Sequence, residues 1–467
     1  MFSKTPFCFK DICLILTFFS FFFLSLNYHR STSIFQKLTS FSSTITAATN
    51  KNSPTTVNHL VFSIASSSKT FSKRKELLPL WYKPNSTKAY VFLDHTPSDN
   101  SPKNIDLPQI LIYENTSRFP YTHRKGARYA IGITCMIKQV VARDDPNVRW
   151  YIFGDDDTVF FVDNLVKTLE KYDHNEWYYI GSNSESYAQN AYFSFDMAFG
   201  GGGYAISRPL AKALAGVLDS CLMRYPNLYG SDARIFSCLA ELGVSLTHEP
   251  GFHQDDLWGN LFGLLSSHPL SPLLSLHHVE RMHSIFPNMT KIQALKHLFK
   301  AANADPTRIS QQTICYDRKN SLSVSIAWGY AIQVYEGNIK LPDLITVLRT
   351  FEPWDKDKKR PHFMFRTRVE SNDPCKKMVA FLKSVDSYGN NVWTNYTRYR
   401  VGKTCAKDGN KIKNLEEIRV FSRKLDADTR QVRAPRRQCC DVSLSSNKSM
   451  DIQIRPCGID EFITMSP

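Results

Sequence analysis

The stretch Trp150-Tyr-Ile-Phe-Gly-Asp-Asp-Asp157 decides the predicted fold of this chain of 467 residues. Its apolar half is typical of a buried strand, and three carboxylates follow at once. Similar short apolar runs occur at Leu60–Ala65, Ala89–Asp94, Gln109–Tyr113 and Trp177–Gly181. Residues 127–141 instead carry apolar side chains at helical spacing. Strands that alternate with helices predict a mostly parallel α/β sheet, whose ligands bind at the carboxyl ends of the strands.

The three carboxylates of Asp155, Asp156 and Asp157 therefore fall at the predicted ligand-binding edge. Clustered carboxylates repel one another, and a bound cation explains them best. Their hard oxygen atoms suit Mn²⁺ or Mg²⁺, and such an ion can hold a diphosphate. The alternative is a solvated acidic loop or a set of helix-capping residues. The pair Asp144-Asp145 has no strand before it and is interpreted as a turn.

A run of four glycines lies between Phe199 and Tyr204. Glycine lets the backbone approach a ligand closely, so Gly201 and Gly202 are candidate ligand-contacting residues. The run matches neither a dinucleotide fingerprint nor a phosphate-binding loop of the Walker type. The alternative is a hinge or a tight turn before a helix that begins near Pro209.

Two further segments offer chemistry. Gly230-Ser231-Asp232 opens a predicted helix, and Asp232 can act as a general base if Ser231 caps that helix in its place. His253 follows a short predicted strand and can supply a nitrogen ligand to the same metal, or can be a structural histidine. Four more histidines follow, but neither cysteines nor an HExxH spacing accompanies them, so zinc is not indicated. They are His268, His277, His278 and His283.

The N-terminal region predicts the topology. Ile12–Leu26 is apolar and uncharged, and a transmembrane signal anchor is predicted over residues 12–28, after a cytosolic tail of residues 1–11. A cleaved signal peptide is the alternative, but no A-x-A site follows closely. Residues 29–57 are rich in Ser and Thr and predict a flexible stem. Five N-x-[ST] sites lie beyond it and fit a luminal body.

Composition and the cysteine count limit the possible partners and indicate a second module. The net charge is +15, but the basic residues are spread along the chain, so no nucleic-acid partner is expected. Nine of the eleven cysteines lie beyond the anchor, and an odd number leaves at least one thiol free or intermolecular. Beyond residue 305 the apolar pattern changes to period two, as in Ser321–Gly337. We therefore expect a C-terminal β-rich, Cys-containing module over residues 306–467.

These motifs, in this order, resemble the fringe-type glycosyltransferases of glycosyltransferase family 31. The chain is most similar to the plant fringe-related family of uncharacterised glycosyltransferase-like proteins. The segments that carry the resemblance are YIFGDDDTVFFVDNL (151–165), FGGGGYAIS (199–207), PGFHQDD (250–256) and HPLSPLLSLHH (268–278). It covers roughly residues 58 to 300.

The resemblance implies a GT-A-like (Rossmann-like) nucleotide-sugar domain over residues 58–305 and a single-pass type II protein of the Golgi membrane. It implies an inverting enzyme that uses Mn²⁺ (or Mg²⁺) to move a hexose or N-acetylhexosamine from a UDP-sugar to a glycan or glycoprotein acceptor. Carried over by motif, Asp157 is the main metal ligand with Asp155 and His253, and Asp232 is the base. Asp155, Asp156, Gly201 and Gly202 would then bind the donor.

Two departures from the family pattern bear on this reading. Fringe-type proteins commonly carry an acidic pair at the base position, where this chain has Ser231-Asp232. The C-terminal β-rich module is absent from animal fringes. The alternatives are a non-catalytic glycan-binding or scaffold protein on the same fold, and a glycoside hydrolase, which would need two carboxylates flanking one bond.

Overall fold

The computed structural model describes residues 53–96, 106–268, 270–355, 361–369, 377–400, 412–425, 429–446 and 448–465. The predicted cytosolic tail and the signal anchor, with most of the stem, lie outside these ranges. None of the described helices has the length and apolar character needed to cross a membrane. Residues from Thr55 onward form one compact unit with a mixed α/β architecture.

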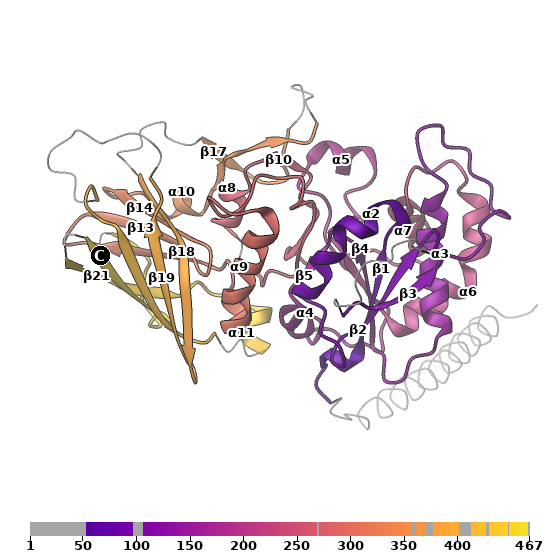
Figure 1. Cartoon of the computed structure of the whole chain (residues 1–467), viewed down its shortest axis with the longest axis horizontal. Helices are drawn as coiled ribbons and strands as arrows, with labels where there is room; N and C mark the ends of the chain where they lie inside the picture. Colours follow the sequence, from indigo (N-terminus) through magenta and orange to yellow (C-terminus); the bar gives the residue numbers. More distant parts are fainter. Residues whose placement is uncertain are drawn as a thin grey trace, which may run out of the picture. The chain divides into compact units, whose positions relative to one another are not determined.

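The first sheet has seven strands (Figure 1). Their spatial order is β3 (Gln109–Ile112), β2 (Lys88–Leu93), β1 (Leu60–Ala65), β4 (Trp150–Asp155), β7 (Tyr204–Ser207), β6 (Tyr179–Gly181) and β8 (Leu246–His248). The five predicted strands are confirmed to within two residues at each end. The sheet is mostly parallel as predicted, except that β7 runs antiparallel to β4 and β6.

Both faces of this sheet are buried. Along β1, Leu60, Phe62 and Ile64 point into one hydrophobic core, while Val61 and Ala65 point into another. The second core is completed by α3 (Tyr129–Ala142), α6 (Arg208–Arg224) and α7 (Ser231–Glu241). The first includes α2 (Ser68–Arg74), α4 (Val162–Leu169) and α9 (Lys291–Ala304) (Figure 1). Alternation with period two explains how one strand serves two cores.

A small three-stranded sheet brings distant segments to the carboxyl edge of the first. Its strands are β5 (Val159–Phe160), β11 (Ser275–Leu276) and β9 (Phe252–His253). Leu276 pairs with both Val159 and His253. The residue that follows β11, His277, is therefore held beside the three carboxylates that precede β5.

The remaining short elements connect these parts. They are η1 (Val57–His59), η2 (Lys75–Leu80), α5 (Tyr187–Tyr192), β10 (Leu257–Gly259), α8 (Phe262–Leu265), η3 (Pro306–Arg308), α10 (Leu341–Ile345), β15 (Val347–Arg349), β16 (Phe351–Pro353), β17 (Thr367–Val369) and α11 (Thr429–Arg433). Strand β10 pairs with β16, and β15 pairs with β17.

Residues beyond 305 form an eight-stranded sheet, as the period-two pattern predicted. Its order is β12 (Gln312–Asp317), β13 (Leu322–Ala327), β14 (Ala331–Glu336), β18 (Lys377–Tyr388), β19 (Asn391–Arg398), β20 (Glu417–Arg423), β22 (Ser449–Arg455) and β21 (Cys439–Ser446). All neighbours are antiparallel except β20 and β22. One hydrophobic core joins this sheet to β1 through α9, so the domain boundary after residue 305 stays a prediction.

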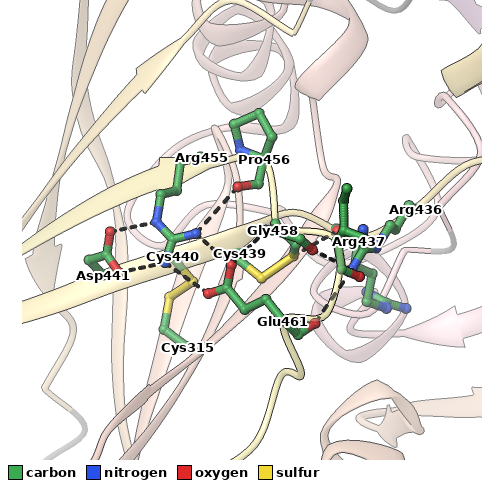
Figure 2. The surroundings of a disulfide bond; sticks show 12 residues. Cys315, Arg436, Arg437, Cys439, Cys440, Asp441, Arg455, Pro456, Gly458 and Glu461 are labelled. Carbon is green, nitrogen blue, oxygen red and sulfur yellow. Dashed lines mark hydrogen bonds and ion pairs between the residues drawn. A yellow bond between two sulfur atoms is a disulfide. The ribbon is translucent and has the colours of Figure 1, made fainter.

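Disulfides reinforce the C-terminal sheet. Cys315 on β12 bonds to Cys440 on β21, and the adjacent Cys439 bonds to Cys457 (Figure 2). A third disulfide joins Cys221 to Cys238 and links α6 to α7. The thiol of Cys135 is free and buried, which confirms that at least one cysteine remains unpaired.

Candidate functional site

A tight turn at the end of β4 sets the directions of the three carboxylates. The Asp155 N–H donates to Thr158 Oγ1 at 2.8 Å, and the Thr158 N–H donates back to the Asp155 carbonyl at 3.0 Å. The Thr158 hydroxyl also donates to the Gly201 carbonyl at 2.8 Å. This turn leaves the Asp155 side chain 40% exposed and buries Asp156 and Asp157. The acidic run is therefore fixed against the glycine run.

Asp156 is held by helix α2. Its carboxylate accepts hydrogen bonds from Ser66 Oγ at 2.5 Å and Thr70 Oγ1 at 3.2 Å. The guanidinium of Arg74 lies 2.8 Å away. Burial raises the pKa of Asp156, and these partners act against that rise. The contacts fasten α2 to the end of β4, so Asp156 has a structural role whatever it binds.

Asp157 faces histidines that the motif analysis did not assign. Its Oδ1 lies 3.2 Å from His277 Nε2, and its Oδ2 lies 3.0 Å from Arg74 Nη2. Both oxygens are buried and make no aligned hydrogen bond. Burial alone would raise the pKa of this carboxyl, but His277 and Arg74 outweigh burial and hold the pKa below its usual range.

The two histidines differ in charge. Burial acts to lower the pKa of His277, but Asp157 and Asp155 raise it to about 9. Burial and the neighbouring His277 cation lower the pKa of His278 to about 2, so its ring is neutral. The plane of His278 lies nearly parallel to Trp354, which stacks in turn on Trp258.

Asp157, His277 and His278 can together hold a metal ion. Their potential ligand atoms lie within 4.8 Å of one another. The Asp157 oxygens and His278 Nδ1 are buried without hydrogen-bond partners, as expected of atoms that serve a ligand. A carboxylate with imidazole ligands suits Mn²⁺, and the His277 ring would release its proton when the ion binds. The residues present therefore fit the implied cation.

His253 belongs to a different group. Its Nδ1 lies 3.0 Å from Glu185 Oε1, and its Nε2 lies 3.0 Å from His268 Nε2. With Glu185 and Asp255 it forms a second buried set of potential ligands. Both of its ring nitrogens thus have protein partners, and the structure does not group His253 with Asp157. Its assignment as a metal ligand stays a prediction.

The glycine run passes between the acidic run and the start of helix α7. A Cβ on Gly200 would lie 2.6 Å from Asp232 Oδ1, and one on Gly201 would lie 2.1 Å from the His277 ring. Gly202 donates its N–H to Gln254 Oε1 at 2.7 Å. Side chains at these positions would collide with the candidate site, which explains why glycine is required there.

Asp232 lies in the first turn of α7, whose N-cap residue is Gly230. Neither Ser231 nor Asp232 is the N-cap residue, so both capping alternatives are wrong, and the Ser231 hydroxyl instead donates to Asp232 Oδ1 at 3.2 Å. Burial raises the pKa of Asp232. The partial burial of Asp155 and the charges of Asp157 and Asp232 raise its pKa to about 7, while His277 opposes the rise. The charges of Asp155, Asp157, Asp232 and His277 therefore influence one another's pKa values.

Sequence reasoning missed His277, His278 and Arg74. His277 and His278 end the HPLSPLLSLHH segment, directly after β11. That strand has only two residues, so no periodicity identifies it. Arg74 ends a short helix that carries no chemical motif. The position of the histidines follows from pairing between strands far apart in the sequence.

Comparisons with known proteins place these features in a family. Residues 189–440 match the family described as "Protein of unknown function, DUF604". A stretch of 119 residues is 28% identical to a Beta-1,3-glucosyltransferase of Homo sapiens, covering 26% of this chain and 23% of that protein. A stretch of 107 residues is 31% identical to the Beta-1,3-glucosyltransferase of Mus musculus, covering 23% and 21%.

The chain thus spans less than a quarter of the length of the glycosyltransferases it matches. This partial similarity supports a glycosyltransferase, in agreement with the resemblance to glycosyltransferase family 31. The family match is broader, because it covers more than half of the residues. The chain accordingly belongs to the DUF604 family of proteins of unknown function.

Proposed function

We propose that this protein is an inverting, metal-dependent glycosyltransferase with a GT-A-like fold that uses a UDP-sugar as its donor. One observation carries the proposal: a buried ligand set and a candidate base lie on either side of a glycine run at the carboxyl edge of the sheet. The ligand set is Asp157, His277 and His278, and the base is Asp232. The partial similarity to β-1,3-glucosyltransferases supports the same class of reaction.

Asp157, His277 and His278 would hold Mn²⁺ (or Mg²⁺), with Asp155 at its exposed side. The bound ion supplies positive charge that balances a departing diphosphate. The cation of Arg74 contributes charge beside Asp157 and keeps Asp156 fixed. The donor would approach the backbone of the glycine run, where a side chain would collide with Asp232 or His277.

Asp232 would accept the proton of the attacking acceptor hydroxyl. Its carboxylate is raised in pKa by burial, which makes it a stronger base than an exposed aspartate. The leaving group departs on the ligand-set side of the glycine run, and the acceptor would enter on the Asp232 side. Attack opposite the leaving group inverts the anomeric centre. A second carboxylic acid, which a glycosidase needs, is not required.

The transferred sugar would be a hexose or N-acetylhexosamine. The relatives are named as β-1,3-glucosyltransferases, so UDP-glucose is the first donor to test. The acceptor would be a glycan or glycoprotein. We also propose a Golgi membrane location with residues 12–28 as the anchor. The three disulfides among the described residues support an oxidising compartment.

Calorimetric titration of UDP into the purified protein, with Mn²⁺ and with EDTA, tests the proposal. We expect metal-dependent binding that Asp157→Ala abolishes while the variant keeps its circular dichroism spectrum. Asp163→Ala is the matched control, because Asp163 is an exposed carboxylate in the first turn of α4 and belongs to neither buried group of potential ligands. Absence of UDP binding by the folded wild type would contradict the proposal and favour a non-catalytic glycan-binding protein.

A further inference from the structure

A basic loop (residues 121–129) lies next to the proposed base and has no part in the functions described so far. No aspartate or glutamate occurs between residues 115 and 143, a stretch with six Lys and Arg residues. Four of these six, Arg118, Lys138, Arg128 and Arg143, have carboxylate, carbonyl, amide or aromatic partners elsewhere. Arg124 and Lys125 are exposed, and neither has a carboxylate partner among the described residues.

The basic loop is fixed to the segment that carries Asp232. The Thr122 N–H donates to the Pro226 carbonyl at 2.9 Å, and the Tyr121 hydroxyl donates to the Tyr229 carbonyl at 2.9 Å. The guanidinium of Arg234 lies 4.9 Å from the centre of the Tyr121 ring. Three contacts thus hold the loop against residues 226–234, so its cations stay near the start of α7.

Glycine makes this contact close. A Cβ on Gly126 would lie 1.8 Å from the Tyr121 hydroxyl and 2.9 Å from the Tyr229 carbonyl. No other residue fits there without separating the loop from the segment that leads to Asp232. Arg128 ties the end of the loop to the segment that precedes it, donating to the carbonyls of Thr116 at 2.7 Å and Phe119 at 2.6 Å. The cations are therefore presented by an ordered loop.

Aromatic rings border the same surface. Tyr129, which ends the loop, is 63% exposed, and Tyr229 is 47% exposed. His123 packs edge-on against Tyr229, with ring centres 5.4 Å apart. Exposed tyrosines offer an apolar face and a polar edge, a combination that suits a sugar ring.

We propose that the basic loop, with Tyr129 and Tyr229, is the acceptor subsite and that it takes an anionic saccharide. The inference rests on the proposed function, because it assigns the acceptor side of the same site. A pyranose ring would pack on the tyrosines with its hydroxyl directed at Asp232. A carboxylate or sulfate on that sugar, or on the next, would pair with Arg124 and Lys125. Arg is well suited to such oxyanions.

Binding of defined oligosaccharides to the full-length protein tests this inference. The probes are an oligosaccharide of uronic acid residues, the same oligosaccharide with its carboxyls methyl-esterified, and a sulfated oligosaccharide. The double variant Arg124→Gln/Lys125→Gln removes the two cations. The control, Lys296→Gln/Lys300→Gln, removes two exposed cations from α9. Titrations at low ionic strength measure each affinity.

We expect the wild type and the α9 control to bind an anionic probe, and the loop variant to bind it about tenfold more weakly. The methyl ester should bind equally weakly to all three proteins, and added salt should reduce the difference. Preference between the uronate and the sulfated probe identifies the anion. Equal affinity for the acid and its ester, or an equal loss in the α9 control, would overturn the inference.

A second titration separates this inference from the proposed function. UDP with Mn²⁺ should bind the loop variant as it binds the wild type, because neither cation belongs to the ligand set. If the protein binds the uronate but never UDP, the glycosyltransferase proposal fails while the anionic-saccharide surface stands. If UDP binds and no anionic probe does, the inference fails and the proposed function stands.

Discussion

The carboxyl edge of the first sheet and the disulfide-linked end of the C-terminal sheet differ in whether their charged side chains are buried or in contact with solvent. At the first, Asp157 is buried beside His277 and Arg74 with oxygens that make no aligned hydrogen bond, and burial lowers the pKa of the adjacent His278. At the second, Arg455 lies between Asp441 and Glu461 on a solvated surface (Figure 2). Burying charged and polar groups costs stability even where charges are paired, so we interpret the first region as a chemical site and the second as a structural one.

The largest expected effect comes from Asp232→Asn. We expect the rate of sugar transfer to fall by about 10²–10⁴-fold, because the amide cannot accept the proton. UDP and Mn²⁺ should still bind. The raised pKa means that the ionised carboxylate opposes folding at neutral pH, so the thermal midpoint should stay level or rise. A variant that retains full transfer would remove Asp232 from the mechanism.

A pair of histidine variants sharpens the assignment of the ligand set. His277→Ala should lower Mn²⁺-dependent affinity for UDP by roughly a hundredfold or more, by analogy with the loss on disturbing metal-site residues. His253→Ala should have a smaller effect on that affinity, since both of its ring nitrogens have other partners. Titration of UDP at fixed Mn²⁺ compares them. The opposite ranking would restore His253 as the ligand.

Removing a disulfide tests the structural region. Cys315→Ser/Cys440→Ser opens a link between residues 125 positions apart, and we expect a loss of about 2–5 kcal/mol in the free energy of unfolding. Affinity for UDP at a temperature where the variant is folded should not change. Chemical denaturation followed by circular dichroism measures the first quantity. A matching loss of UDP affinity would show that the two regions are coupled.

The pH dependence of transfer follows from the sign of the Asp232 shift. A base must be ionised, and a raised pKa moves ionisation to higher pH. We therefore expect kcat/KM to rise with pH along an acid limb centred above the usual aspartate value of about 4. Binding of UDP and Mn²⁺ measured at each pH corrects for loss of metal. A limb at or below pH 4 would contradict a raised pKa.

The smallest effect is expected from Arg455→Gln. Its ion pairs with Asp441 and Glu461 are exposed and screened by solvent. The thermal midpoint should fall by less than in the cysteine double variant, and the difference from wild type should shrink in high salt. Scanning calorimetry at two salt concentrations measures this. A loss equal to that of the disulfide would make these ion pairs structural elements in their own right.

Local sequence patterns were sufficient to predict the strands that position the candidate site. Strands β1, β2 and β4 have mostly apolar sequences, and the position of Asp155 at a strand end follows from the apolar residues before it. The glycine run could also be recognised as a candidate for close approach, with a hinge or a tight turn as the alternative. These features depend on residues near one another in the sequence.

The features that could not be predicted from the sequence depend on pairing between strands that are far apart in the chain. His277 reaches Asp157 because Leu276 pairs with Val159, more than a hundred residues earlier in the chain. Strand β7 runs antiparallel although its neighbours suggested a parallel sheet. In both cases the strand has only two to four residues, and its position and direction are set by the strands with which it pairs. Its own composition carries no such information.

The disulfide between Cys315 and Cys440 has a consequence for solubility. Strands β12 and β21 are the two outermost strands of the C-terminal sheet, and outermost strands present unpaired N–H and C=O groups that recruit other chains. The covalent bond holds β12 and β21 against each other, and Arg437 donates a further hydrogen bond to the Gln312 carbonyl. Reducing agents would therefore do more than loosen the sheet, because they would release two templates for self-association.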